Sequence, residues 1–260
     1  MMSDASPVLV EACVDSVASA IAAQRGGAGR VELCDALFDG GTTPSAGMIA
    51  ACKDAVSIPV FVMIRPRGGA FVYSDAERDV MRRDIRIARD IGADGMVIGG
   101  LLPNGQLDLA LVKMLVEEAK GLPVTFHRAF DLTPDLGESL EVLAEAGVQR
   151  ILTAGGTSTA SDGATVLASL ARRAGSRLTV LAGGGVREEN VAALVWASGA
   201  REVHVRLTRL TLGERPPSRR DLRVRRPLPE DEAAWEETDE SRIRSFIKAL
   251  AAAPKSAQHI

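Results

Sequence analysis

The sequence contains few cysteine and aromatic residues for its length. Of 260 residues, three are cysteine, two tryptophan, one tyrosine and six phenylalanine. Cys13, Cys34 and Cys52 form no C-x-x-C pair, which excludes a zinc ribbon or a thioredoxin-like motif, and their odd number indicates a reducing compartment. An aromatic content of 3% argues against a surface on which nucleic-acid bases stack, and it leaves a core of Val, Ile, Leu and Ala.

The chain also lacks a strong net charge and a long apolar run. Lys and Arg number 31 against 34 Asp and Glu, a net charge of -3, so we expect no nucleic-acid partner bound through bulk positive charge. No stretch reaches about 18 uncharged apolar residues, and the first residues are acidic where a secretory signal would be basic. We therefore expect no membrane partner and a cytoplasmic location.

Short β-branched runs alternate along the chain with stretches of helical spacing. The helical pattern is clearest over 74–91, where apolar residues share one broad face among Arg and Asp. The predicted strands are 8–13, 31–34, 59–64, 96–98, 123–127, 151–153, 179–182 and 203–205. Eight βα units that close on themselves predict an α/β fold, a (β/α)8 TIM barrel. The alternative is an open doubly wound sheet, but no early strand ends in a G-x-G-x-x-G turn.

The domain organisation follows from the same pattern. We expect residues 1–260 to form one domain, with the barrel strands within 8–205 and a closing helix over 239–253. Between them, 206–238 shows no periodicity and contains Pro216, Pro217, Pro227 and Pro229, with basic residues first and acidic residues second. This composition indicates a long solvated loop whose charges satisfy each other, and the alternative is an interaction arm.

Ionisable residues cluster late in the predicted strands, where barrel enzymes carry their catalytic groups. Alternate residues of a strand share a face, and this parity places one set toward the interior. That set includes Glu11, Glu32, Arg65, His127 and His204. If the pocket is an active site, Glu11 or Glu32 suits a general base, His127 an acid, and Arg65 a clamp on a carboxylate or phosphate. The alternative is a buried ion-pair network without chemistry.

Glycines mark the same end of the barrel and predict an anion site, because glycine lets backbone N–H groups approach a ligand. The alternative is that they serve tight turns. The predicted anion-binding residues are Arg67, Gly155, Gly156, Gly183, Gly184, Gly185 and His204.

Cys13 and Cys34 each lie two positions beyond an inward glutamate on neighbouring strands. Two thiolates near Met63 would form a soft site of the type that Cu(I) prefers, whereas the alternative is that all three cysteines are small buried apolar side chains. Cys52 has Met48 one helical turn before it, which indicates packing against the strands. None of the lysines ends a predicted strand, so a Schiff-base mechanism lacks its nucleophile.

Several segments resemble the CutC family, which is named for copper homeostasis. They are EACVDS (11–16), RVELC (30–34), GGTTPS (40–45), VMIRPRGG (62–69), YSD (73–75), TFHRAFD (125–131), ILT (151–153), GG (155–156) and GGGV (183–186). The resemblance covers about residues 8 to 205. It ends after His204, where the family usually reads His-Gly-Ser-Ala and this chain continues with Val205 and Arg206.

The resemblance implies a cytoplasmic TIM-barrel protein, usually a homo-oligomer, that is associated with copper handling. It also implies Cu(I) binding, for which the matching residues are Cys13, Cys34 and Cys52. Two functional hypotheses follow. The first is a copper-linked binding protein, and the second is a barrel enzyme that acts on a small anionic or phosphorylated metabolite by acid–base chemistry.

Overall fold

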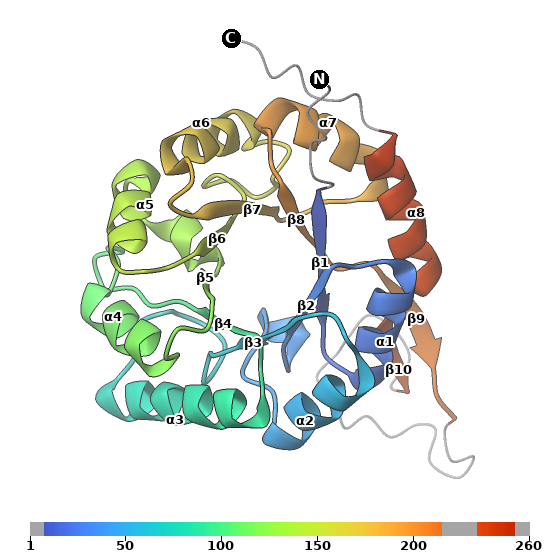
Figure 1. The fold of residues 1–260 in the computed structure, drawn as a ribbon, viewed down its shortest axis with the longest axis horizontal. Coiled ribbons are helices and arrows are strands. Elements are labelled where there is room, and N and C mark those ends of the chain that lie inside the picture. The colour runs from blue at the N-terminus through green and yellow to red at the C-terminus, as the bar shows by residue number, and fades with distance from the viewer. Residues whose placement is uncertain (1–7, 215–232, 253–260) are drawn as a thin grey trace.

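The structure is a computed structural model that describes residues 8–214 and 233–252. Eight strands form a closed barrel in chain order, and helices surround it, as Figure 1 shows. The first strand pairs in parallel with both the second and the eighth, which closes the sheet. The predicted (β/α)8 TIM barrel is confirmed, and the open doubly wound alternative is wrong.

Each of the eight predicted runs overlaps an observed strand. The barrel strands are β1 (Leu9–Val14), β2 (Arg30–Leu33), β3 (Val60–Met63), β4 (Gly95–Ile98), β5 (Val124–Phe126), β6 (Arg150–Thr153), β7 (Thr179–Gly183) and β8 (Glu202–Val205). The helices are α1 (Val17–Gly26), α2 (Ala46–Ala55), α3 (Asp75–Ile91), α4 (Leu109–Glu118), α5 (Leu136–Glu145), α6 (Ala164–Ala174), α7 (Glu188–Ser198) and α8 (Glu240–Ala251). Two short 3-10 helices are η1 (Leu37–Asp39) and η2 (Arg128–Leu132).

Local sequence signals set the helix ends. Ser74 and Glu77 form a capping box that starts α3, because each side chain accepts a hydrogen bond from the other's backbone N–H. Gly27 and Gly92 end α1 and α3 in the left-handed region, with φ of 102° and 98°, where a side chain would be strained. The chain turns from these glycines directly into the next strand.

Alternation along the strands produces an outer core and an interior. The outer core is mainly aliphatic and lies between strands and helices, and it includes Ala12, Val31 and Ile98. The interior cluster contains Cys13, Cys34, Phe61, Met63 and Val97. Residues of one strand therefore divide between the two cores, which directs every second side chain toward the barrel axis.

The segment after β8 differs from its prediction. Where a loop is expected over 206–238, the structure shows the antiparallel strands β9 (Thr208–Leu212) and β10 (Ala234–Thr238). The expectation of a loop is wrong at these two ends, because Thr238 donates its N–H to Ser19 of α1 at 3.0 Å and Arg206 pairs with Glu236 at 2.5 Å. Residues 215–232 lie outside the described residues. Tertiary contacts create strands that period-2 apolar alternation does not indicate.

The closing helix is present as α8, close to the predicted range of 239–253. Asp239 caps it by accepting the N–H of Ser241 at 2.8 Å. Within residues 8–214 and 233–252, no helix combines the length and apolar character that crossing a membrane requires.

Candidate functional site

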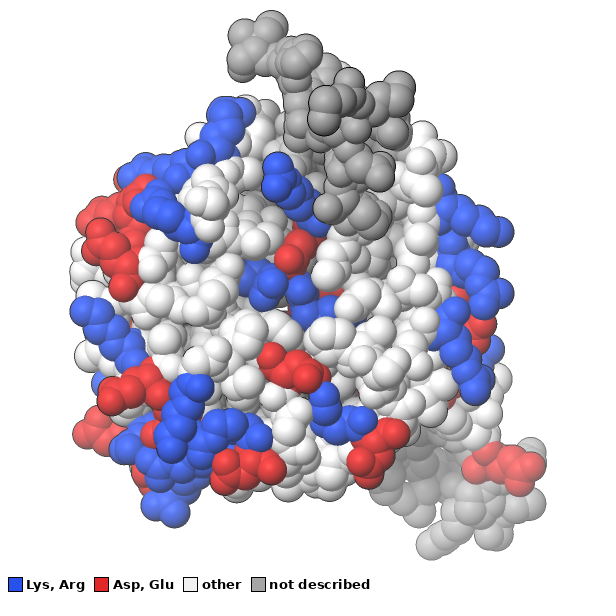
Figure 2. Space-filling model, in the orientation of Figure 1, with Lys and Arg blue, Asp and Glu red and all other residues white. Residues whose placement is uncertain are grey.

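A chain of buried ion pairs runs through the barrel interior. Glu11 accepts hydrogen bonds from Arg30 and from His204 Nδ1, the latter at 2.8 Å. Arg30 also pairs with Glu202 at 2.6 Å, and Glu202 pairs with Arg150 at 2.6 Å. Basic and acidic side chains also lie together at the centre of the face shown in Figure 2. We call Arg150, Glu202, Arg30 and Glu11 the ion-pair chain.

The ion-pair chain changes the role of Glu11. Burial alone would raise the pKa of Glu11, but the hydrogen bond from His204 and the charge of Arg30 outweigh burial and lower the pKa to about 2. Glu11 therefore stays ionised and its oxygens are occupied, so it is a poor general base. Its geometry suits it to hold His204 in place.

Sequence analysis missed Arg30, Arg150 and Glu202 as interior residues. The available signal was strand parity, because Arg30 shares the inward face with Glu32, and Glu202 shares it with His204. The guanidinium groups of Arg30 and Arg150 lie over the Phe61 ring, with Cζ atoms 5.0 Å and 5.3 Å from its centroid. These contacts pack the charged layer against the apolar interior.

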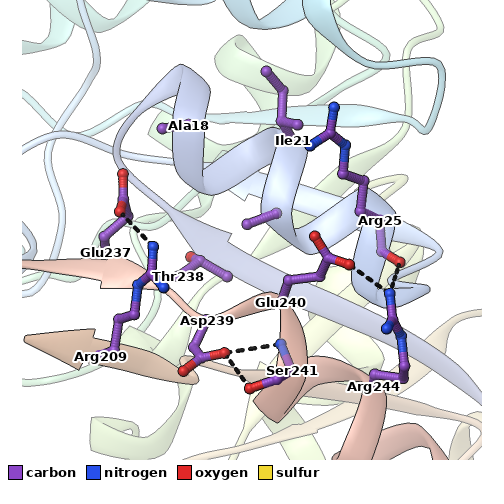
Figure 3. Close-up of a pocket in the computed structure, with 11 residues that line it drawn as sticks. Ala18, Ile21, Arg25, Arg209, Glu237, Thr238, Asp239, Glu240, Ser241 and Arg244 are labelled. Carbon is purple, nitrogen blue, oxygen red and sulfur yellow. Dashed lines mark hydrogen bonds and ion pairs between the residues drawn. The ribbon is translucent and has the colours of Figure 1, made fainter.

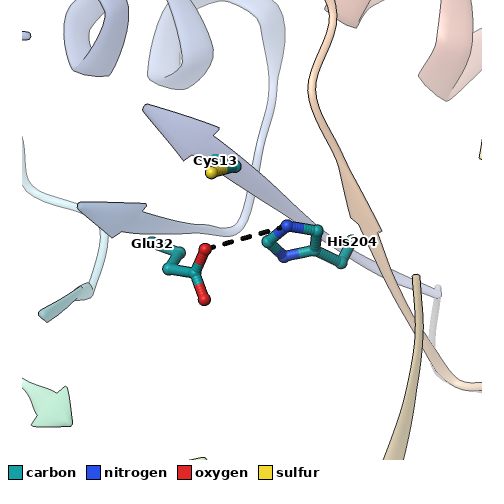
Figure 4. Close-up of side chains that lie close together, drawn as sticks. All are labelled: Cys13, Glu32 and His204. Atoms are coloured by element: carbon teal, nitrogen blue, oxygen red, sulfur yellow. Dashed lines mark ion pairs between the residues drawn. The ribbon is translucent and has the colours of Figure 1, made fainter. Parts of the chain in front are cut away.

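A second group lies at the carboxyl ends of β1, β2 and β8. Ligand atoms of Cys13, Glu32 and His204 all lie within 4.8 Å of one another, and Figure 4 shows the three side chains converging. His204 Nε2 is 3.8 Å from Glu32 Oε2, and the Cys34 thiol donates to the same oxygen at 3.5 Å. We call Cys13, Glu32, Cys34 and His204 the thiol cluster.

The neighbouring charges and hydrogen bonds shift the pKa values within the thiol cluster in different directions. A hydrogen bond from Cys34, with His204 nearby, holds the pKa of the Cys13 thiol well below its usual range although burial opposes this. The same pairing with Cys13, together with burial, raises the pKa of Cys34. Burial lowers the pKa of His204, but the charge of Glu32 and the hydrogen bonds to Cys13 and Glu11 raise it well above its usual value. Cys13 is thus the sulfur that loses its proton first.

Glu32 differs from the other members of the thiol cluster in its pKa and in its hydrogen bonding. Burial is the largest cause that raises its pKa well above the ordinary value, and the neighbouring Cys13 and Glu11 add to the effect. Its Oε1 atom is buried and has no hydrogen-bond partner among the described residues. A buried acceptor without a partner is costly, and it marks a place where a ligand or proton can be held.

Cys52 does not join the thiol cluster. It lies on α2 and packs in the outer core between helices and strands, whereas Cys13 and Cys34 lie in the interior cluster. Burial raises its pKa to about 11, so it keeps its proton. The structure therefore does not bring Cys52 to the two other thiols, and the packing alternative describes its position.

Arg65, Thr125 and His127 form a third group at the ends of β3 and β5, and we call them the donor cluster. Arg65 and His127 are 4% and 5% exposed, and Thr125 is fully buried. Arg65 Nε, Thr125 Oγ1 and His127 Nε2 have no hydrogen-bond partner among the described residues. Burial, with a contribution from the charge of Arg65, lowers the pKa of His127 to about 3, so its ring is neutral.

Arg67 does not reach the barrel mouth. Its guanidinium pairs with Glu77 at 2.6 Å, donates to the carbonyl oxygens of Gly68, Ala70 and Val72, and lies over the Tyr73 ring. These contacts brace the β3–α3 loop. These contacts occupy four of the five N–H donors of Arg67, so its role as an anion ligand stays a prediction.

The glycine pair after β6 surrounds an internal carboxylate. Ala154 and Gly156 donate their N–H groups to Asp131 at 3.0 Å, and Thr153 also donates to it. Asp131 thus occupies the position where the sequence predicts an external anion. The N–H of Gly155 donates instead to Thr153 Oγ1 at 2.8 Å.

The glycines after β7 have local structural reasons. A Cβ atom on Gly183 would lie 2.4 Å from Leu152 Cδ1 and 3.1 Å from His204 Cβ, so a larger residue there would require Leu152 to move. Gly184 and Gly185 have φ of 109° and 63°, in the left-handed region that favours glycine. The tight-turn alternative describes the conformation of Gly184 and Gly185, whereas Gly183 lies in β7 against Leu152.

A further cavity of about 540 Å³ lies outside the barrel between α1, β10 and the start of α8 (Figure 3). Two of its arginines are paired, since Arg209 pairs with Glu237 at 3.4 Å and Arg244 pairs with Glu240 at 2.5 Å, and Asp239 caps α8. This cavity is therefore a weaker site candidate than the barrel interior.

The fold and the site define a class, a TIM-barrel protein with two thiols, a carboxylate and an imidazole gathered inside its rim. The model of the CutC family matches residues 8–208. The chain belongs to the CutC family, which confirms the resemblance seen in its sequence.

Named relatives agree with this assignment. The chain is 50% identical over 196 residues to the copper homeostasis protein cutC homolog of Mus musculus, covering 75% of this chain and 72% of that protein. It is 42% identical over 242 residues to a family protein CutC of Xanthomonas campestris, covering 93% and 98%. A crystal structure of a CutC protein from Streptococcus agalactiae is similar with a TM-score of 0.73 and 35% identity, covering 76% of this chain and 97% of that one.

Proposed function

We propose that this protein binds Cu(I) in the thiol cluster, with Cys13, Cys34 and His204 as the ligands. The observation that carries the proposal is the convergence of Cys13, Glu32 and His204 within 4.8 Å inside the barrel, with the Cys34 thiol 3.5 Å from Glu32 and beside Cys13. Thiolate and imidazole donors suit Cu(I), whereas a purely carboxylate site would favour Mg²⁺, Ca²⁺ or Mn²⁺. The copper homeostasis proteins among its relatives support the same metal.

The surroundings of the ligands fit this role. His204 Nδ1 is held by Glu11, so Nε2 is the nitrogen that faces Cys13 and Glu32. A carboxylate that orients a metal-binding histidine is a common outer partner of metal sites. Glu32 accepts a hydrogen bond from the Cys34 thiol, and this proton must leave when the sulfur binds a metal.

The two thiols are placed for a shared metal and not for a disulfide. Cys13 lies opposite Glu32 in the register of β1 and β2, so Cys34 is its diagonal neighbour two residues further. Strand spacing and rise put their Cα atoms about 8 Å apart, beyond the range of about 7 Å that a disulfide tolerates. We expect a mild oxidant to leave both thiols free, as thiol titration of the unfolded protein would show.

Competition with a coloured Cu(I) chelator under anaerobic conditions tests the proposal. The wild-type chain should take up one equivalent of Cu(I), and the Cys13→Ala, Cys34→Ala double variant should take up none. Cys52→Ala is the matched control and should bind as the wild type does, because Cys52 lies in the outer core. Equal binding by the double variant and the wild type would overturn the proposal.

Acid–base catalysis by Glu11, Glu32, Arg65 and His127 receives less support. Glu11 is held in ion pairs, and Arg65 donates three hydrogen bonds to backbone carbonyl oxygens. A general base needs a free basic atom near the reacting group, and of the two glutamates Glu32 offers one, its Oε1 atom, within the described residues. We therefore place copper binding first and treat Arg65 and His127 as binding groups.

We also propose a cytoplasmic location and a homo-oligomer, which are what the resemblance of the sequence to the CutC family implies. Cell fractionation tests the first and light scattering in solution tests the second. A monomer at all concentrations would remove the oligomer proposal.

A further inference from the structure

Arg65 carries a buried positive charge that no carboxylate neutralises within the described part of the chain. Its guanidinium donates to the carbonyl oxygens of Asp39 at 2.9 Å, Gly41 at 2.8 Å and Gly69 at 3.0 Å. The Nε atom has no partner there. Arg30 in the same barrel has two carboxylates, so Arg65 is the unusual case, because buried charges are normally paired.

His127 presents a second unpaired donor. Its Nδ1 accepts the N–H of Ala129 at 3.1 Å. A neutral imidazole that accepts through one nitrogen carries its proton on the other. Nε2 is therefore a buried N–H donor, and it lacks a partner among the described residues.

The strand register shows that these donors share one side of the barrel interior. Met63, Val97 and Thr125 form a row across β3, β4 and β5. Moving two residues along each strand gives Arg65, Gly99 and His127, the next inward positions.

Gly99, between Arg65 and His127 in this row, makes room for the His127 ring. A Cβ atom there would lie 2.0 Å from the His127 ring, so the imidazole occupies the volume that a side chain would fill. Phe71 packs beside both donors, with its ring centroid 4.9 Å from Arg65 Cζ and 4.9 Å from the His127 ring.

We propose that the donor cluster is a binding site for a small oxyanion, a carboxylate or inorganic phosphate, held by Arg65 Nε, Thr125 Oγ1 and His127 Nε2. A water molecule could accept hydrogen bonds from these donors, but it would leave the charge of Arg65 uncompensated. An oxyanion supplies both several acceptor lone pairs and the missing negative charge. The ligand is small because the donors are almost completely buried.

The proposed oxyanion site is separate from the thiol cluster and does not rest on copper binding. Gly41 lies between the two, since its carbonyl accepts from Arg65 and a Cβ on it would lie 3.1 Å from Cys34 Sγ. Failure of copper binding therefore leaves this proposal standing, and the reverse also holds.

Nitrogen NMR of the histidine side chains tests the site, since the chain has only three histidines, His127, His204 and His259. The probes are acetate, inorganic phosphate and acetamide, which has the shape of acetate without its charge. Acetate or phosphate should shift the Nε2 resonance of His127 and raise the thermal midpoint, because a ligand that binds the native state stabilises it. A response to acetate alone identifies a carboxylate site, and one to phosphate alone a phosphate site.

Variants connect the response to the named donors. Thr125→Val keeps the side-chain shape and should weaken anion binding about tenfold, the effect of one lost hydrogen bond to a charged group. His127→Leu should abolish binding and His127→Gln, which retains an N–H near the position of Nε2, should restore part of it. The Cys13→Ala, Cys34→Ala variant should keep the anion response.

Two results would overturn the proposal. One is no shift of His127 with either anion at tens of millimolar. The other is an equal shift with acetamide, which would show that the pocket does not recognise charge.

Discussion

His204 and His127 hold similar positions on opposite sides of the barrel, each facing inward near the end of its strand, yet their surroundings differ. His204 lies between Glu11 and Glu32, and carboxylates raise its pKa. His127 lies beside Arg65 in a dry environment, and its pKa falls to about 3. The surroundings therefore favour the protonated imidazole at His204 and the neutral imidazole at His127, and a metal bound at His204 would displace its proton. Neighbouring charge and burial, not residue type, decide what an inward histidine can do.

The largest expected effect comes from a variant in the ion-pair chain, which lies on the His204 side of the barrel. Arg30→Met leaves Glu11 and Glu202 buried without their shared cation, so the free energy of unfolding should fall by about 3–5 kcal/mol. Urea denaturation measures this loss. The matched control is Arg83→Met, whose pair with Asp79 is exposed to water and should contribute little. Equal stability of both variants would contradict the ion-pair chain as a structural element.

The next largest effect comes from a variant beside His127, the histidine with the lowered pKa. Gly99→Ala forces a methyl group into the His127 ring, and we expect a loss of about 1–3 kcal/mol in the free energy of unfolding. Gly47→Ala is the control, because its nearest neighbour is 4.0 Å away and an α2 position tolerates alanine. If Gly99→Ala proves neutral in urea denaturation, the imidazole does not occupy that space.

A smaller effect contrasts the two histidines by pH. The depressed pKa of His127 means that the unfolded chain binds a proton first, so stability falls as the pH drops below about 6.5 toward 3. The raised pKa of His204 stabilises the native state below about 6.5, and this contribution is lost as the pH rises through the folded pKa.

Replacing each histidine by glutamine should remove its own slope. His127→Gln should flatten the stability curve by about 1 kcal/mol between pH 6 and 5. His204→Gln should remove the part of the stability loss that His204 causes in the wild type as the pH rises from 7 to 8. Denaturation curves at these pH values provide the measurement. If both substitutions change the slope of unfolding free energy against pH in the same sense, the contrast between the two histidines is refuted.

The smallest effect concerns the apo stability of Thr125→Val. The Thr125 hydroxyl is buried without a partner in the described residues, so its replacement by a methyl group should raise the free energy of unfolding by less than about 1 kcal/mol. Thermal unfolding in a buffer free of carboxylate and phosphate measures this. A clear loss of stability would indicate that the hydroxyl has a bound partner even without an oxyanion.

The architecture and much of the interior were predictable from local pattern. Strand parity placed Glu11, Glu32 and His204 inward, because side chains alternate with a period of two in any strand. Eight β-branched runs predicted the barrel, since parallel strands joined by helices close in few ways. The hairpin formed by β9 and β10 was missed, because contacts with α1 stabilise it and period-2 alternation does not mark it.

What the residue order determined by itself was the fold, the family and part of the set of inward side chains, without Arg30, Arg150 and Glu202. Only the tertiary structure decided which of them meet. The register of β1 with its two neighbours brings Arg30 and His204 to Glu11, and the packing of α2 in the outer core separates Cys52 from Cys13. The physical reason is that alternation is a local property of each strand, whereas ion pairing and burial depend on the shear between strands distant in sequence.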